Sequence, residues 1–235
     1  KRMGSPRQNL DALFAGLREA PPQVRFRDPL ANSVVEETLS AGAVAAVVRL
    51  YAYTPTIAAM LPLSLHEAAS GRPEMLAAQA RMLTSMLGES IMHGMQLSVI
   101  CTEDAPGLAV NPADAGTVIG NAMIEVLKAQ CAVWPTGSVA PDFHTALVSD
   151  APVLLMSGEF DPVTPPRYGE TALAQFANGR HLVLRGQGHN VVGTGCMPRL
   201  LGQFIDTTDA KALDATCLEP LYDTPPFAGY YGWEP

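Results

Sequence analysis

Two residues whose types and positions could do chemistry each follow an apolar segment. Asp161 comes shortly after the run PVLLMS, and His189 comes shortly after the next such run, HLVLR. A carboxylate that accepts the Nδ1 hydrogen of an imidazole fixes the tautomer of the ring and stabilises the imidazolium. The other ring nitrogen is then free to take a proton from a nucleophile. The sequence therefore predicts that Asp161 and His189 form a catalytic acid–base pair.

Each residue also has a simpler interpretation. Asp161 precedes Pro162, and Asp-Pro pairs are common in turns. His189 lies near Gly186 and Gly188, where a histidine is often an exposed loop residue. The joint pattern favours the catalytic interpretation, because ligands in open α/β sheets bind beyond the carboxyl ends of the strands.

The elements around the pair alternate between strand and helix. PVLLMS and HLVLR read as strands, with helices expected at about residues 166–176 and from about residue 196. This alternation predicts a parallel sheet covered on both faces, and the apolar PVLLM fits a strand buried on both sides. Neighbouring strands lie about 5 Å apart, so the two loops can meet. Three recognisable strands are few for such a sheet, so we expect that the beginning of the protein is missing.

The first part of the chain is predicted to be mostly helical. We expect a helical cap or lid lobe at residues 1–95 and the carboxyl-terminal part of an α/β core at residues 96–235. Met75, Met82 and Met86 are expected to pack in the core of the lobe. The further expected elements are a helix around residues 10–17, a hairpin at 24–39, helices at 40–49, 54–71 and 73–92, a strand MQLSVIC at 95–101 and a helix at 111–130.

No nucleophile is recognisable. A Gly-x-Ser-x-Gly turn does not occur in the 235 residues, and GESIM at residues 88–92 lacks the final glycine and a preceding strand. Either the serine lies in sequence upstream of the chain or the chain is inactive.

Composition excludes several classes of partner. The net charge of −8 and a pI near 5.0 argue against binding to nucleic acid. No apolar run is long enough to span a bilayer. The chain begins with KRMGSPR, so the lack of a visible export signal says little. His66, His93 and His144 show no spacing typical of a metal site, and we expect no metal or cofactor. The four cysteines allow two disulfides in any of three pairings.

The motifs SGEFDPVTPP and GQGHN, followed by Cys196 and Cys217 around the last helix, resemble the carboxyl-terminal region of bacterial α/β-hydrolases. The chain resembles serine exopeptidases of the proline iminopeptidase and tripeptidyl aminopeptidase type, and MQLSVICTEDAP and CAVWP also resemble segments of that group. The resemblance implies an α/β-hydrolase fold with a helical cap, and it matches Asp161 and His189 to the triad acid and base. It further implies a disulfide between Cys196 and Cys217, which leaves Cys101 with Cys131, and a periplasmic or secreted location.

An aminopeptidase must bind the protonated amine of its substrate. Glu103 and Asp104 follow the expected strand MQLSVIC, so a carboxylate at that strand end could bind the amine. The alternative is that these residues only cap the next turn.

The predicted function is thus a serine hydrolase that releases residues or short peptides from peptide amino termini. One alternative is an esterase or amidase for small acyl substrates, and another is a non-catalytic fragment or binding subunit that lacks the nucleophile. The expected partners are a peptide or small acyl substrate and an upstream part of the same protein that carries the serine.

Overall fold

The structure is a computed structural model that describes residues 3–233, with only the backbone described at residue 89. The chain divides into two compact units. The helical unit contains residues 4–47 and 64–145, and the sheet unit contains residues 48–63 and 146–233. The division therefore does not follow the expected boundary at residue 95, because residues 48–63 pack with the later part of the chain. Each unit is described by itself below.

The helical unit begins with α1 (Pro6–Glu19), as the leucine spacing predicted. The hydroxyl of Ser5 accepts a hydrogen bond from the amide of Gln8 at 3.4 Å, and proline at the first helical position suits the fixed φ of its ring. Phe14 and Leu17 form the buried face of this helix.

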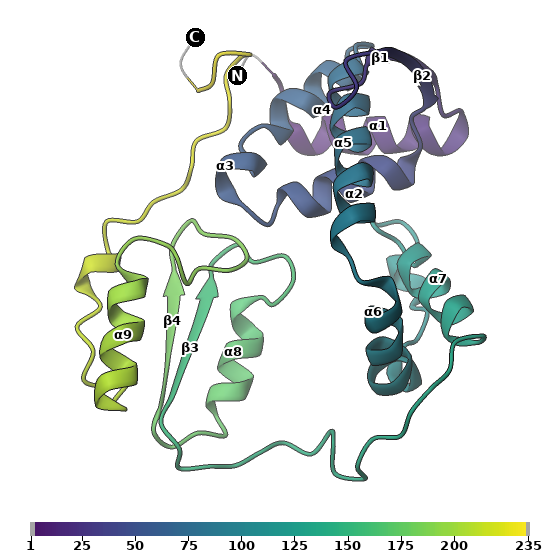
Figure 1. The fold of residues 1–235 in the computed structure, drawn as a ribbon. Helices are drawn as coiled ribbons and strands as arrows, with labels where there is room; N and C mark the ends of the chain where they lie inside the picture. The colour runs from purple at the N-terminus through teal and green to yellow at the C-terminus, as the bar shows by residue number, and fades with distance from the viewer. Residues whose placement is uncertain (1–2, 234–235) are drawn as a thin grey trace. The chain divides into compact units, whose positions relative to one another are not determined.

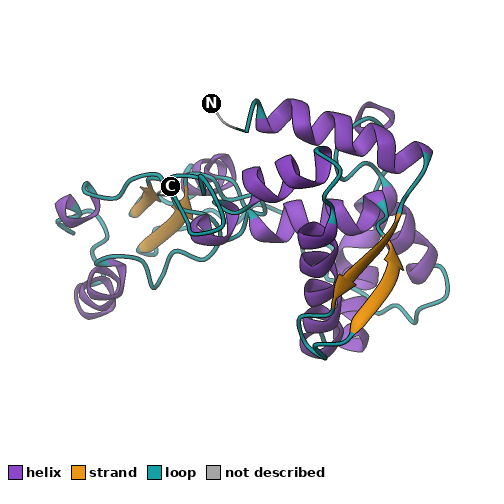
Figure 2. Cartoon of the chain, turned by 90° about the horizontal axis from the view of Figure 1, so that it is seen from above, coloured by secondary structure: helices purple, strands orange, loops and turns teal. Residues whose placement is uncertain are grey.

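The predicted hairpin consists of β1 (Gln23–Arg27) and β2 (Val34–Thr38), which pair antiparallel. Val24 and Phe26 are buried and alternate with exposed residues, as a strand with one covered face requires. Strand β1 packs against α5 (Glu74–Ser90). Figure 2 shows this hairpin and the other pair of strands as separate sheets.

A buried carboxylate fixes the turn of the hairpin. Asp28 accepts hydrogen bonds from the amides of Leu30 (2.8 Å) and Ala31 (3.2 Å). These bonds lower the pKa of its carboxyl, and they outweigh burial, which acts in the opposite direction. Arg81 of α5 lies 3.2 Å from Asp28 and 3.0 Å from Glu37 of β2. Arg81 therefore links both ends of the hairpin to the helix.

Replacing Arg81 by methionine is expected to lower the midpoint of thermal unfolding by roughly 5 °C, because it leaves the buried Asp28 carboxylate with one partner fewer. Because the pKa of Asp28 is lowered in the folded state, its stabilising effect is present above the ordinary value of 3.8 and is lost as the pH falls through the folded value. Calorimetry at pH 7 checks the shift. Arg7→Met, which removes an exposed ion pair with Asp11, is the matched control and should change little. Equal midpoints for the two variants would contradict the prediction.

The predicted helix at residues 40–49 is α2 (Ala41–Tyr51), and the Ser40 hydroxyl caps it by accepting from the amide of Ala43 at 3.1 Å. The predicted helix at 54–71 is two helices, α3 (Pro55–Ala58) and α4 (Leu61–Ala69). Thr54 makes no side-chain capping bond to α3. As predicted, the helix ends just before Gly71, which has a φ of +84°. The core position expected for Met86 is wrong, because its side chain on α5 is 56% exposed.

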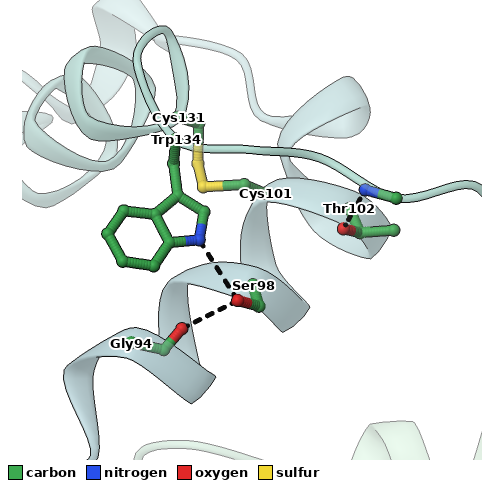
Figure 3. The surroundings of a disulfide bond; sticks show 7 residues. Gly94, Ser98, Cys101, Thr102, Cys131 and Trp134 are labelled. Carbon is green, nitrogen blue, oxygen red and sulfur yellow. Dashed lines mark hydrogen bonds between the residues drawn. A yellow bond between two sulfur atoms is a disulfide. The ribbon is translucent and has the colours of Figure 1, made fainter.

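The expected strand at residues 95–101 is wrong. These residues form α6 (His93–Val99) and continue into a π-helical turn (Ile100–Asp104). One local and one tertiary hydrogen bond of Ser98 accompany the helix. The hydroxyl of Ser98 donates to the carbonyl of Gly94 one helical turn earlier, and it accepts from the indole of Trp134 at 3.2 Å (Figure 3). A strand could not make the bond to Gly94.

The helix expected at 111–130 begins later than predicted. Short 3₁₀ turns occupy Ala105–Gly107 and Pro112–Asp114, and α7 (Ala122–Cys131) starts after Gly120, whose φ is +59°. A disulfide joins Cys131, at the end of α7, to Cys101 on the π-helical turn, with an S–S distance of 1.99 Å (Figure 3). Beside it, the amide of Gly137 donates to the hydroxyl of Thr102 at 3.0 Å. The loop after α7 is thus fixed to α6 and the π-helical turn.

Replacing both Cys101 and Cys131 by serine is expected to lower the free energy of unfolding by roughly 3 kcal/mol, because the disulfide closes a loop of 30 residues and so restricts the unfolded chain. Urea denaturation without reductant measures the change. Thr102→Val keeps the disulfide and removes only the neighbouring hydrogen bond, so its effect should be smaller. A double serine variant as stable as wild type would contradict the prediction.

The sheet unit contains β3 (Val153–Gly158) and β4 (Gly179–Leu184), which pair parallel from Val153 opposite Gly179 to Gly158 opposite Leu184. Two helices follow the strands, α8 (Pro166–Leu173) and α9 (Met197–Thr207). This is the predicted strand–helix–strand–helix order. The first four residues of β3 are half-buried rather than fully buried.

The two helices lie on opposite faces of the strand pair (Figure 1). Leu182 and Leu184 of β4 pack with Met197 and Leu200 of α9 in one apolar cluster. His181 points to the other face, where it contacts Gly169 of α8, and a Cβ at that glycine would lie 2.6 Å from the ring. Successive side chains of β4 point to opposite faces, so Leu182 and Leu184 face α9, whereas His181 faces α8.

Among the described residues, no helix has the length and apolar character needed to cross a membrane.

Candidate active site

Asp161 lies in the turn that follows β3. Its Oδ1 accepts hydrogen bonds from the amides of Val163 (2.8 Å) and Thr164 (2.9 Å), and its Oδ2 accepts from the Thr164 hydroxyl (3.0 Å). The side chain is only 4% exposed. Asp161 therefore does form a turn, but this accounts for only part of its hydrogen bonds.

The carboxyl of Asp161 stays charged in this environment. Burial by itself would raise its pKa, but the hydrogen bonds from Thr164, Val163 and His189 outweigh burial, and the pKa lies below its ordinary value of 3.8. An ionised carboxylate accepts hydrogen bonds and donates none. The proton in any bond between this carboxylate and an imidazole must therefore belong to the imidazole.

His189 lies in the loop that follows β4, and close backbone contacts hold this loop against the loop of Asp161. A Cβ at Gly158 would lie 1.9 Å from the carbonyl oxygen of Gly188, so the end of β3 must be glycine. The amide of Phe160 donates to the carbonyl of Gln187 at 2.8 Å, and the amide of Gly186 donates to the Glu159 carboxylate at 2.8 Å. The positive φ of Gly186, +69°, makes the tight turn.

The structure brings the two predicted residues together. Nδ1 of His189 lies 2.9 Å from Oδ2 of Asp161. The acid is buried, whereas the His189 side chain is 34% exposed. Both side chains border one cavity of about 300 Å³. The other residues that line it are Met156, Gly158, Thr164, Asn190, Val191 and Val192.

The chemistry of the pair follows from this geometry. Because Asp161 is ionised, neutral His189 carries its proton on Nδ1, and Nε2 has a lone pair. Nε2 can therefore accept a proton from a group that enters the cavity, and the carboxylate stabilises the resulting imidazolium.

The hydroxyl of Thr164 was not singled out from the sequence, although it donates to the same oxygen that His189 contacts. Replacing Thr164 by valine in the full-length protein is expected to lower kcat/KM about threefold to tenfold, because Oδ2 of Asp161 loses one of its two hydrogen-bond partners and is held less firmly against His189. The pKa of Asp161 should rise, so activity should fall off at a higher pH on the acid side. A pH series of kcat/KM checks both effects.

Thr171→Val is the matched control, because the Thr171 hydroxyl donates to the carbonyl of Arg167 within α8 and, among the described residues, does not bond Asp161 or His189. A Thr164→Val variant whose kcat/KM falls off at the same acidic pH as that of wild type would contradict the role given to the Thr164 hydroxyl.

Glu103 and Asp104 do not lie at the end of a strand. They lie on the π-helical turn of the helical unit, where Glu103 is half-buried and Asp104 is exposed. The helix that replaces the expected strand therefore removes the reason for assigning them to amine recognition.

The second disulfide joins Cys196 to Cys217 and belongs to the sheet unit, with an S–S distance of 1.95 Å. It links the start of α9, which directly follows the loop of His189, to the 3₁₀ turn Thr216–Leu218. Both disulfides have the pairing that the family resemblance implied. Within residues 3–233, no group of three or more His, Cys, Asp and Glu side chains is placed to hold a metal ion.

Two contacts of the pair were not anticipated, those with Thr164 and Tyr53, and neither was the bond from the Gly186 amide to Glu159 in the adjoining loops. The carbonyl of Tyr53 accepts the amide hydrogen of His189 at 2.7 Å. The contact with Thr164 could have been predicted from the sequence, because a hydroxyl three residues after an aspartate can bond its carboxylate. The sequence gives no indication of the contact with Tyr53, because the two residues are far apart in the chain.

Comparison with known families adds independent support. Residues 116–217 match the model of an α/β-hydrolase family that is described as TAP-like protein. The match supports an α/β-hydrolase. It covers somewhat less than half of the chain and includes Asp161, His189 and the Cys196–Cys217 disulfide. No curated protein and no solved structure matches the chain significantly. A TAP-like α/β-hydrolase domain supports a hydrolase as the class of activity.

Proposed function

We propose that the protein is a serine hydrolase of the exopeptidase type that acts on the amino termini of peptides. His189 is the general base and then the general acid, and Asp161 orients it. The observation that carries the proposal is the 2.9 Å contact between Nδ1 of His189 and Oδ2 of the buried Asp161, at the border of a cavity.

The reaction would proceed through an acyl-enzyme. A serine oxygen attacks the carbonyl of the scissile bond while its proton passes to Nε2 of His189. The imidazolium then protonates the leaving amine, and His189 activates a water molecule that hydrolyses the ester. The serine is proposed to come from an upstream part of the same protein, because no Gly-x-Ser-x-Gly turn occurs in the printed sequence.

The preference for peptides rests on the TAP-like family match and on the resemblance of the motifs to exopeptidases. Two disulfides are consistent with an oxidising compartment, so we propose that the protein is exported.

The test compares substrates for the full-length protein. Aminoacyl and peptidyl arylamides should be turned over with a higher kcat/KM than short-chain aryl esters and than the same arylamides with an acetylated amino terminus. Efficient turnover of the simple esters alone would instead show an esterase. Equal turnover of free and acetylated peptides would contradict recognition of the amino terminus.

A further inference from the structure

The loop of His189 contacts a segment from much earlier in the chain, the turn between α2 and α3. At this turn the Tyr53 carbonyl accepts the His189 amide hydrogen at 2.7 Å. The rings of the same two residues meet edge to face, with centroids 5.2 Å apart and an interplanar angle of 70°. Main chain and side chain of Tyr53 thus both contact the proposed base, and all these residues belong to the sheet unit.

Glycines make this approach possible. A Cβ at Gly188 would lie 2.3 Å from the Tyr53 carbonyl oxygen, closer than any side chain allows. On the other side, Gly188 itself lies against Gly158 at the end of β3. The backbone before His189 is therefore packed between the strand that leads to Asp161 and the turn that contains Tyr53.

The ring contact restricts a rotation of the imidazole that the hydrogen bond to the carboxylate leaves free. A single hydrogen bond from Nδ1 to Asp161 fixes one ring atom, but the imidazole can still turn about that bond. A second ring at 5.2 Å in an edge-to-face arrangement opposes such turning.

We propose that Tyr53 is a positioning residue for His189. Its carbonyl fixes the backbone of the base, and its ring holds the imidazole in the orientation that presents Nε2 to the nucleophile. Tyr53 contacts His189 through its carbonyl and its ring, so its effect on turnover passes through His189, and this part of the proposal rests on the proposed function.

The experiment uses the full-length protein with Tyr53→Ala, Tyr53→Leu and Tyr53→Phe. The alanine and leucine variants should lower kcat about threefold to tenfold and change KM less than twofold, because the carbonyl is kept and only the ring contact is lost. Tyr53→Phe keeps the ring and should retain wild-type kcat. Tyr168→Ala, which removes an exposed tyrosine on α8, is the matched control and should change neither constant.

A second readout does not depend on turnover. In full-length protein with ¹⁵N-labelled histidine, the Nδ1 proton of His189 should exchange with water faster in the alanine and leucine variants, and at the wild-type rate in Tyr53→Phe. A folded leucine variant with wild-type kcat and proton exchange would overturn the proposal. A loss in Tyr53→Phe as large as in Tyr53→Ala would also overturn it, because the hydroxyl rather than the ring would then be responsible.

The two proposals fail in different ways. If His189→Ala hydrolyses substrates as fast as wild type, the proposed function is wrong. The exchange rate of the His189 Nδ1 proton in the Tyr53 variants then still tests whether Tyr53 holds the imidazole. If His189→Ala is inactive and Tyr53→Leu is unchanged in both readouts, only the positioning role is wrong.

Discussion

His189→Ala in the full-length protein is expected to lower kcat for peptide arylamides by about 10⁴- to 10⁶-fold, because it removes the proposed base that takes the proton of the nucleophile. The fold should persist, since the His189 side chain is partly exposed and the backbone bond to Tyr53 does not need it. Steady-state kinetics and near-ultraviolet circular dichroism measure the two effects. His144→Ala, at an exposed loop position, is the matched control. A folded His189→Ala variant within tenfold of wild type would contradict the assigned role.

Asp161→Asn is expected to lower kcat by about 10³- to 10⁴-fold with little change in shape. The amides of Val163 and Thr164 require an oxygen at the Oδ1 position, so the new NH₂ group must face His189. An NH₂ group cannot accept the Nδ1 hydrogen. The imidazole should therefore move its proton to Nε2, which can then no longer act as a base.

Asp209→Asn is the control for the turn that Asp161 also makes. Oδ1 of Asp209 accepts from the amides of Lys211 and Ala212, the same spacing as at Asp161, but no histidine contacts it in the described structure. Kinetics and ¹⁵N spectra of the histidine ring should show a loss of activity and a change of tautomer only for Asp161→Asn. Equal losses in both variants would show that the turn, rather than the pair, matters.

The part of the site that depends on local order was predictable. Alternating strands and helices placed Asp161 and His189 after β3 and β4, and parallel strands bring their carboxyl ends to the same edge. The first helix, the hairpin, α5 and α9 were recognisable from apolar spacing, caps and breakers.

The errors arose where tertiary contacts decide. MQLSVIC alternates polar and apolar residues, and a short apolar run does not distinguish strand from helix. In the structure it is helical, with Ser98 bonded to Gly94 and Trp134, and with Cys101 paired to Cys131. The position of Glu103 and Asp104 was inferred from that strand, so it failed with it.

The packing of residues 48–63 with the later part of the chain could not be predicted from the sequence either. Nothing in the pattern around Tyr53 shows that its carbonyl meets the backbone of His189. The glycines at 158 and 188 would have been informative only once two backbones were known to approach there.

The most direct test of the acid–base pair is labelling of the full-length protein with a fluorophosphonate, followed by mass spectrometry of the modified peptide. We expect one labelled serine, in sequence upstream of the printed chain, with labelling that is lost in His189→Ala and kept in His144→Ala. No labelled serine, or a labelling rate that does not depend on His189, would contradict it.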